Sequence, residues 1–287
     1  MTTARTGTAT APPVADTNQH YDQDPRIFTL FLDSSHKYSS ALYGSPEESL
    51  ADAQRRKLHF VADRLGLRGG ERVLDIGCGW GSLVLFMAAE YGCRTVGITP
   101  APRQRDYIAQ RAAERGLAEK VEIRLGHVER LSLPAGGFDA VTMLGSIVHM
   151  PDLDGVFATC RDVLRRAGRL YVSESCFRNE AARTRFGDRS STAYVRDSIF
   201  GWGDMRPLSR LVKGAEDAGF SLVALDDLTA HYHRTISDWI ANVDRNADRL
   251  EEVEAGLAAR LRRYLETANA GWGYTTKHYA LTCQRSR

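Results

Sequence analysis

The sequence predicts an α/β fold with a seven-stranded, mainly parallel sheet, because short apolar runs alternate with helix-length amphipathic segments from Glu71 onward. Two further observations support this class. Two of the helical segments end at Gly92 and Gly116, and glycine favours a left-handed helix cap. A glycine-rich turn also joins the first expected strand to the first helix of this region. With 287 residues, of which 43% are hydrophobic, the chain can bury a full core.

The first part of this pattern contains five expected strands and three expected helices, which alternate as in a parallel sheet wrapped by helices. In chain order they are RVLDIG (72–77), SLVLFMAAEYG (82–92), RTVGIT (94–99), PRQRDYIAQRAAERG (102–116), KVEIRLG (120–126), FDAVTMLG (138–145), LDGVFATCRDVLRRAG (153–168) and RLYVSESC (169–176).

The alternation breaks after Cys176. Residues 178–205 are polar, irregular and dotted with aromatic side chains, which predicts a lid inserted over a site. The remaining elements are a helix at 207–219, a strand at 220–228, one long helix over 236–269 and a last strand at 276–284. The last two strands are expected to form a hairpin-like pair.

Three regions are expected along the chain. Residues 1–20 are rich in Thr, Ala and Pro, without a hydrophobic signal-peptide segment, and read as a flexible N-terminal tail. Residues 21–66 have a helical pattern and are predicted to form a cap over the carboxyl ends of the strands. Residues 67–287 then form the core that carries the lid.

Composition disfavours several classes of function. The formal net charge is only +2 and arginine is spread over helical segments, which disfavours nucleic-acid binding. No apolar run approaches the about 20 residues of a membrane span. The five cysteines form no CxxC pair, which favours reduced thiols in a cytoplasmic protein. Nothing in the sequence suggests a metal site.

The turn VLDIGCGWGS (73–82) places Gly77, Gly79 and Gly81 between a strand and a helix, where bare backbone lets amide groups approach a ligand. The spacing is G-x-G-x-G and not the G-x-G-x-x-G of dinucleotide sites. Asp75 precedes the glycines, and its carboxylate would repel a pyrophosphate but suits a cationic ligand. The charges point to S-adenosyl-L-methionine (SAM), whose sulfonium and ammonium groups are positive; a glycine turn without a ligand is the alternative.

The stretch VLDIGCGWGSLVLFMAAEYGCRTVGITPAPRQ resembles the SAM-binding region of the cyclopropane fatty acid synthase and mycolic acid methyltransferase family. HYDQDPRIFTLFLDSSHKYSSALY is similar to that family's N-terminal cap, and HYHRTISDWIANVDRN to its C-terminal tyrosine segment. The resemblance implies a Rossmann-like class I SAM methyltransferase fold, with SAM as cofactor. Terpenoid C-methyltransferases of the teleocidin-biosynthesis type fall within this resemblance.

The resemblance also implies which residues hold the methionine part of SAM. Tyr38 and Ser39 match the cap residues that close over this part of the cofactor. Asp75, Gly77 and Gly79 match the motif that surrounds it.

The remaining cofactor residues come from the next strand ends. Thr99 and Gln104 match the segment that meets the ribose. His127 and Val128 lie in the turn that aligns with the adenine-contacting turn, although His127 could equally be a surface turn residue. Leu144, at the end of the fourth strand beneath the methyl donor, completes the set.

The family's cyclopropane synthases hold a bicarbonate as base, and here four of its five contacts are replaced. The resemblance places Ser40, Val148, Ser173 and Ser175 at those positions, and only Tyr232 is retained. Because valine cannot orient bicarbonate by hydrogen bonding, cyclopropane formation by that mechanism is disfavoured.

A retained cofactor site with an altered final step favours methylation of an electron-rich alkene carbon in a lipophilic, isoprenoid-containing small molecule. The resulting cation would be quenched by proton loss or cyclisation, and aromatic faces would stabilise it. Several aromatic side chains of the cap, lid and C-terminal region are candidates for this: Tyr21, Phe28, Tyr38, Tyr43, Tyr194, Phe200, Trp202 and Tyr232. The candidate catalytic residues are His149, Tyr21 and Tyr232.

His149 follows the fourth strand in LGSIVHMPD (144–152) and has two readings. It is either a proton acceptor, since imidazole titrates at about pH 6.5, or a strand-end histidine that bonds to backbone. If it is the base for a hydroxyl acceptor, the protein is an O-methyltransferase.

The same residues are compatible with a second substrate class, a fatty acyl alkene, on which the chain would act as an alkene methyltransferase or cyclopropane synthase. A SAM-binding regulatory protein without methyl transfer is a different class of function. A homo-oligomer that exchanges its N-terminal segment is also a hypothesis.

Overall fold

The computed structural model describes residues 24–195 and 203–286, and within them it contains a seven-stranded sheet of order β3-β2-β1-β4-β5-β7-β6. The first five strands pair in parallel, and β7 runs antiparallel to both β5 and β6. The strands are β1 Arg72–Ile76, β2 Arg94–Thr99, β3 Val121–Leu125, β4 Phe138–Leu144, β5 Leu164–Phe177, β6 Phe220–Asp227 and β7 Thr276–Arg285. The predicted α/β class, the seven strands and the final antiparallel pair are confirmed.

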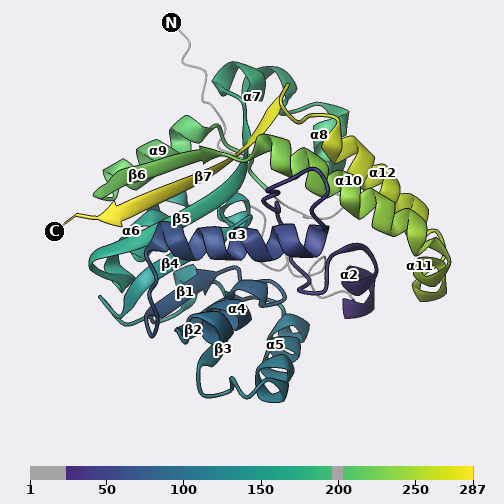
Figure 1. Cartoon of the computed structure of the whole chain (residues 1–287). Coiled ribbons are helices and arrows are strands. Elements are labelled where there is room, and N and C mark those ends of the chain that lie inside the picture. The colour runs from purple at the N-terminus through teal and green to yellow at the C-terminus, as the bar shows by residue number, and fades with distance from the viewer. Residues whose placement is uncertain (1–23, 196–202, 287) are drawn as a thin grey trace, which may run out of the picture.

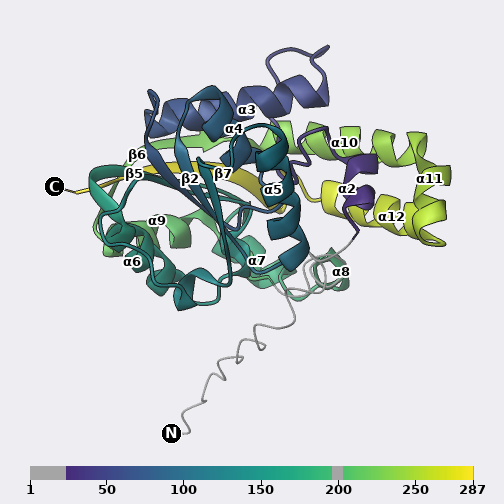
Figure 2. The same cartoon turned by 90° about the horizontal axis from the view of Figure 1, so that it is seen from below.

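Helices cover both faces of the sheet (Figures 1 and 2). Helices α3 (Leu50–Leu65) and α4 (Ser82–Glu90) pack on one face, while α6 (Leu153–Val163) and α9 (Leu208–Asp217) pack on the other. Helix α5 (Pro102–Glu114) packs against α4 and β3.

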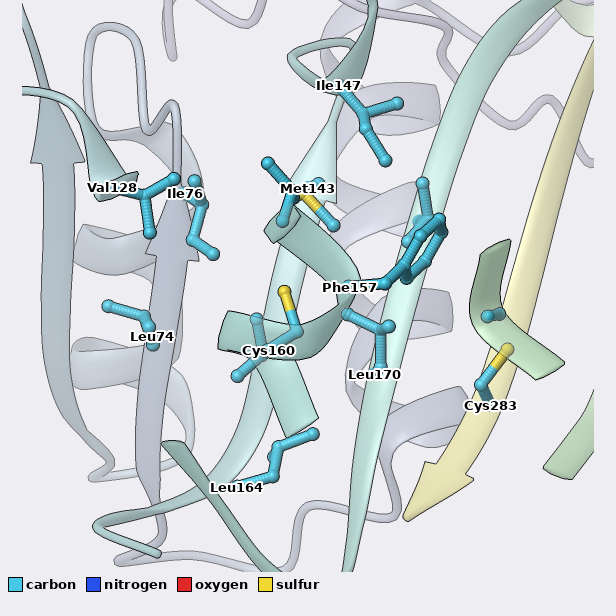
Figure 3. Packing of buried hydrophobic residues seen from close by; sticks show 14 of the residues in the cluster. Leu74, Ile76, Val128, Met143, Ile147, Phe157, Cys160, Leu164, Leu170 and Cys283 are labelled. Atoms are coloured by element: carbon cyan, nitrogen blue, oxygen red, sulfur yellow. The ribbon is translucent and has the colours of Figure 1, made fainter. Parts of the chain in front are cut away.

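The main core lies between the sheet and the α6–α9 face. Alternate residues of the parallel strands point into it, such as Leu74 and Ile76 of β1 and Met143 of β4, and Phe157 and Cys160 of α6 meet them (Figure 3). All of these side chains are almost fully buried. This packing fixes the strand ends that carry the site.

A second cluster of helices stands beside the sheet. It comprises α2 (Pro25–Phe31), α10 (Thr229–Arg245), α11 (Ala247–Val253) and α12 (Leu257–Asn269), which group together in Figure 1. Trp239 of α10 is 1% exposed and packs against Phe31 of α2, with ring centroids 6.3 Å apart. An early segment of the chain is thereby held against a late one.

Two predicted helices differ in extent from the observed ones. The long helix expected over 236–269 is divided into α10, α11 and α12, and Gly256 adopts a positive φ of 76° at the start of α12. The helix expected to reach Gly168 ends at Val163, because Leu164 already pairs with Phe138 in the sheet. Periodicity alone did not reveal either break.

The predicted cap and lid regions contain further helices. Helix α3 covers a sheet face, so within the expected cap of residues 21–66 it packs as a layer helix rather than over the strand ends. Helices α7 (Glu180–Phe186) and α8 (Ser190–Val195) occupy the expected lid of residues 178–205. The domain boundaries stay predictions, and residues 1–20, Tyr21, Phe200 and Trp202 lie outside the described residues.

All five cysteines are buried and free, as predicted. A search of the described helices finds none with the length and apolar character that crossing a membrane requires. Residues 24–195 and 203–286 contain no group of three or more His, Cys, Asp or Glu side chains placed to hold a metal ion.

Candidate active site

A cavity of about 1070 Å³ opens at the carboxyl ends of the parallel strands, where open α/β sheets bind ligands. One end is formed by the glycine turn, the end of β2 and the turn after β3. The other end is formed by β5, β7, α10 and α12, with α7 and α8 over it. One continuous cavity can therefore hold a cofactor and an acceptor side by side.

The glycine turn is held by backbone contacts that need residues without side chains. The amides of Gly77 and Cys78 both donate to the Ile98 carbonyl, at 2.9 Å each. A Cβ on Gly77, whose φ is 77°, would lie 2.4 Å from the Cβ of Ser146. The turn then leads into α4, whose first amides face the cavity end lined by Gly79 and Ser82.

A substitution at Gly79 tests whether a ligand occupies the space beside the glycine turn. The φ of Gly79 is 55°, and a Cβ there would meet no described atom within 4 Å, so the space beside it is cavity. We expect Gly79→Ala to weaken binding of S-adenosylhomocysteine (SAH) by about tenfold or more, because the methyl group occupies ligand space. Isothermal titration calorimetry measures this.

Gly136→Ala is the matched control. Gly136 has a similar φ of 61°, also meets no described atom within 4 Å, and does not line the cavity. Both variants carry the same backbone strain of about 1–2 kcal/mol. Equal SAH affinities of the two variants would contradict a ligand site at Gly79.

A cluster of buried charges lies directly beneath the turn. Asp75 is 1% exposed, and its Oδ1 accepts a hydrogen bond from the Thr142 hydroxyl at 2.8 Å. Burial raises the pKa of the Asp75 carboxyl, while the positive charges of Lys37 and Lys57 act in the opposite direction. Burial lowers the pKa of both lysines, that of Lys57 strongly. The negative charge of Asp75 and the positive charges of the two lysines therefore compensate one another in a buried region.

Asp75 itself does not line the cavity, in contrast to the neighbouring Gly77 and Gly79. Its direct contact with the cofactor stays a prediction. Its Oδ2 is buried and has no hydrogen-bond partner among the residues that the structure describes. An unpaired carboxylate oxygen behind the glycine turn, together with the open space at Gly79, fits a cationic ligand with an ammonium group. The residues present therefore fit SAM.

The two predicted cap residues are brought to the same end of the cavity. The Tyr38 ring packs against Trp239, with centroids 5.2 Å apart, and edge-on to Phe31 at 5.7 Å. The Ser39 hydroxyl accepts a hydrogen bond from the Lys57 ammonium at 3.1 Å. These contacts fix the positions of both side chains beside the glycine turn.

The remaining predicted cofactor residues also line the cavity, at the ends of β2, β3 and β4. The Thr99 hydroxyl donates to Oε1 of Gln104 at 2.6 Å, and both residues are buried. Val128 is buried at the start of a short 3-10 helix, and burial lowers the pKa of the half-buried His127 beside it. Leu144 ends β4 as predicted.

The far end of the cavity has aromatic walls. The Tyr232 ring of α10 lies 4.6 Å from the Trp272 ring, 4.7 Å from the His278 ring and 6.0 Å from the Trp239 ring, between centroids. His149 lines the cavity from the 3-10 helix Ile147–His149, which follows β4 after Gly145. His149 is thus in a turn and not at the strand end itself.

Sequence reasoning missed two polar side chains of this far end, Glu174 of β5 and His278 of β7. The antiparallel register pairs Ser175 with His278, and the imidazole lies 3.2 Å from the Ser173 hydroxyl and 3.4 Å from the Ser175 hydroxyl. The polar run Ser173-Glu174-Ser175 at the carboxyl end of an apolar strand was the available signal for Glu174. His278 became visible only through the pairing of β5 with β7.

Two groups at the cofactor end were also missed. His36 has a positive φ of 53°, lies 6% exposed and stacks on Tyr107, with centroids 5.3 Å apart. Lys37 follows it, and both residues line the cavity. The polar pair before Tyr38 was the sequence signal for them.

Comparison with known proteins finds one matching family and several similar curated relatives and solved structures. A model of the family described as mycolic acid cyclopropane synthetase matches residues 8–280. Sphingolipid C9-methyltransferase B of Emericella nidulans is 30% identical over 269 residues, which cover 92% of this chain and 51% of that protein. Cyclopropane mycolic acid synthase 2 of Mycobacterium leprae is 28% identical, covering 83% of this chain and 82% of that protein.

The chain spans about half to two thirds of the length of the first three curated relatives that it matches. Among solved structures, the cyclopropane synthase MmaA2 from Mycobacterium tuberculosis superposes with a TM-score of 0.87 at 22% sequence identity, covering 97% of this chain and 100% of that one. The fold is therefore the Rossmann-like fold of class I SAM methyltransferases, as predicted.

Proposed function

The chain belongs to the mycolic acid cyclopropane synthetase family, whose members are SAM-dependent methyltransferases, and from this premise we propose that it methylates an alkene carbon of a lipophilic, isoprenoid-containing small molecule. The cofactor of the family is SAM. The observation that carries the proposal is the aromatic wall of Tyr232, Trp239 and Trp272 in the same cavity as the glycine turn.

The chain's residues divide between the two ends of the cavity. Tyr38, Ser39, Gly77 and Gly79 would hold the methionine part of SAM, and Thr99 with Gln104 the ribose. When bound, SAM would supply a methyl group to one alkene carbon. The bond from this methyl group to sulfur would break, SAH would be the leaving group, and a cation would remain on the neighbouring carbon. Holding the two reacting carbons in contact supplies a large part of the rate.

The far end of the cavity suits a cation of this kind. Aromatic faces attract a cation with about 0.5–2 kcal/mol each, and more when water is excluded. A trisubstituted isoprenoid alkene forms a tertiary cation, which such a wall can hold until it loses a proton or is attacked by another double bond. The wall also excludes water, which would otherwise trap the cation as an alcohol.

Tyr232→Leu tests the wall. We expect the turnover number to fall by about tenfold, the effect of losing about 1–2 kcal/mol of cation stabilisation, while SAH affinity is unchanged. Single-turnover kinetics measure the rate of methyl transfer, and calorimetry measures SAH affinity. Tyr279→Leu, in β7 and outside the cavity lining, is the control and should match the unmodified chain.

A fatty acyl alkene is the second candidate substrate, favoured by the curated relatives named for sphingolipid and fatty acid methylation. An O-methyltransferase with His149 as base is the third. The test is a panel of a geranylated indole, a linear terpenoid, an oleoyl phospholipid and a phenol, each incubated with SAM. Preferred turnover of the first two supports the proposal, and preferred turnover of the phospholipid or the phenol contradicts it.

Cytoplasmic location and exchange of the N-terminal segment between subunits stay predictions. The segment concerned, including Tyr21, lies outside the described residues. A monomeric mass in solution would contradict the exchange.

A further inference from the structure

We propose that Glu174 is the catalytic base that removes the proton from the methylated acceptor, with Arg206 and the Val148 turn as its positioning groups. This inference rests on the proposed alkene methylation and names the proton acceptor for it. Glu174 lies on β5 at the centre of the cavity's far end and lines it.

The backbone around Glu174 holds its carboxylate in one orientation. Oε1 accepts from the Ser175 amide at 2.8 Å, and Oε2 accepts from the Val148 amide at 3.2 Å. A carboxylate has about four acceptor positions, so the three backbone amides that act on it, those of Ser175, Val148 and Ile147, leave room for a further proton. The side chain is only 5% exposed, and water competes little for that room.

The charges around Glu174 leave it without a dedicated ion-pair partner in the described structure. Arg206 is the nearby cation, but its guanidinium lies 3.1 Å from the Asp204 carboxylate and donates to the carbonyls of Ile147, Met150 and Pro151. These contacts place Arg206 behind the Val148 turn. Arg206 thus supports the turn and lowers the pKa of Glu174 from a distance.

Burial raises the pKa of the Glu174 carboxyl to about 7, and the backbone hydrogen bonds from Ser175, Val148 and Ile147, together with Arg206, limit the rise. A base with a pKa near the working pH combines a large ionised fraction with good proton affinity. Three other titratable groups that line the same cavity do not match it. Burial lowers the pKa of His278 to about 3 and raises those of Tyr232 and Tyr264, so all three are neutral near pH 7.

The step is a proton transfer. After methylation, the acceptor carries a cation on the carbon next to the newly methylated one. Glu174 takes a proton from a carbon adjacent to that cation, and the electron pair of the broken C–H bond forms a new C=C bond. The carboxyl group then returns its proton to water, so one methyl group is gained and one proton is released. His278 and the Ser175 hydroxyl, which lie 3.4 Å apart, are neutral polar groups of the same cavity.

The experiment uses the full chain with SAM and a geranylated indole, and compares Glu174→Gln with Glu71→Gln. Glu71 is a matched control, because its carboxylate also accepts from two backbone amides, those of Arg68 and Gly69, at 2.8 Å each and outside the cavity lining. We expect Glu174→Gln to bind SAH normally and to lose the proton-loss product by about a hundredfold. An unchanged product distribution in Glu174→Gln would overturn the proposal.

A second variant, Glu174→Ala, distinguishes the loss of a base from a folding defect. Glu174→Ala removes the carboxylate and leaves space, and added formate is expected to restore the proton-loss product in it but not in Glu174→Gln. Restoration would not follow if Glu174 only braced the turn, so failure of rescue in a folded, SAH-binding variant contradicts the base assignment. Loss of the proton-loss product in His149→Ala, with the product retained in Glu174→Gln, would assign the base to His149 and overturn the proposal.

The pH profile gives an independent readout. The proton-loss product should increase as pH rises through about 7 in the unmodified chain, since the base must be ionised. If no acceptor of the panel is methylated, the proposed function fails. The titration of the Glu174 carboxyl, followed by 13C NMR in the SAH complex, then tests the assignment of the base separately. A carboxyl that stays ionised well below pH 7 would overturn the assignment.

Discussion

Asp75→Asn is expected to lower the free energy of unfolding by about 1–3 kcal/mol, the usual cost of leaving buried polar or charged groups without compensation. Asp75 is 1% exposed and faces the buried ammonium groups of Lys37 and Lys57. Asparagine keeps the shape of the side chain but leaves both lysines without this compensating charge. Urea denaturation followed by circular dichroism measures the change.

The loss of stability in Asp75→Asn should also depend on pH, and it should become smaller as pH rises. Burial lowers the pKa of Lys37 and Lys57 in the folded chain, so the unfolded chain binds more protons between the folded and unfolded pKa values. Stability therefore rises with pH in that window, and the deficit of Asp75→Asn should shrink from about pH 7 to about pH 10.

Thr142→Val is the control for this variant. It removes the hydroxyl that donates to Asp75 at 2.8 Å and keeps the carboxylate. Its cost should be about 1–2 kcal/mol, with little change over the same pH range. A deficit of Asp75→Asn that does not vary with pH would contradict the charge cluster.

Trp239→Ala is expected to cost about 3–5 kcal/mol of stability, the range for removing a large buried aromatic side chain. The indole contacts the rings of Phe31, Tyr38 and Tyr232, and so joins α2 and the residues after it to α10. SAH affinity should fall as well, since Tyr38 loses the ring that holds it. Thermal unfolding and calorimetry on one preparation measure both effects.

Trp239→Phe separates packing from hydrogen bonding. The indole nitrogen of Trp239 is buried and has no hydrogen-bond partner among the described residues, so phenylalanine removes an unpaired donor along with some volume. We expect a much smaller loss of stability than in Trp239→Ala. Equal losses in the two variants would contradict packing of an aromatic ring between α2 and α10 as the source of the stabilisation.

The sequence predicted the sheet well because its signals are local. The central parallel strands are largely buried on both faces and appear as apolar runs, as RTVGIT does in β2, whereas the edge strand β3 is partly exposed. The glycine turn was recognised for the same reason, since a strand, three glycines and a helix follow one another directly. Gly92 and Gly116 have positive φ values of 63° and 66° after their helices, as the predicted caps require.

Features that depend on contacts between distant segments of the chain could not be predicted from the sequence. His278 reaches Ser175 only because β7 runs antiparallel to β5 in one register, which no local pattern specifies. Glu174 is visible in the sequence as a polar residue at a strand end, but the Val148 amide that donates to it belongs to another segment. The division of the long helix was missed although Gly256 marked it, because the helical period continues on both sides.

The central claim is methylation at an alkene carbon of an isoprenoid chain, and its most direct test is the position of the transferred carbon. The full chain is incubated with SAM labelled with 13C at the methyl group and with a geranylated indole, and the product is examined by NMR. We predict a labelled methyl group on a carbon of the former double bond, with loss of one proton from the acceptor. A label bound to oxygen or nitrogen, a labelled cyclopropane methylene, or no transfer to any alkene of the panel would contradict the proposed function.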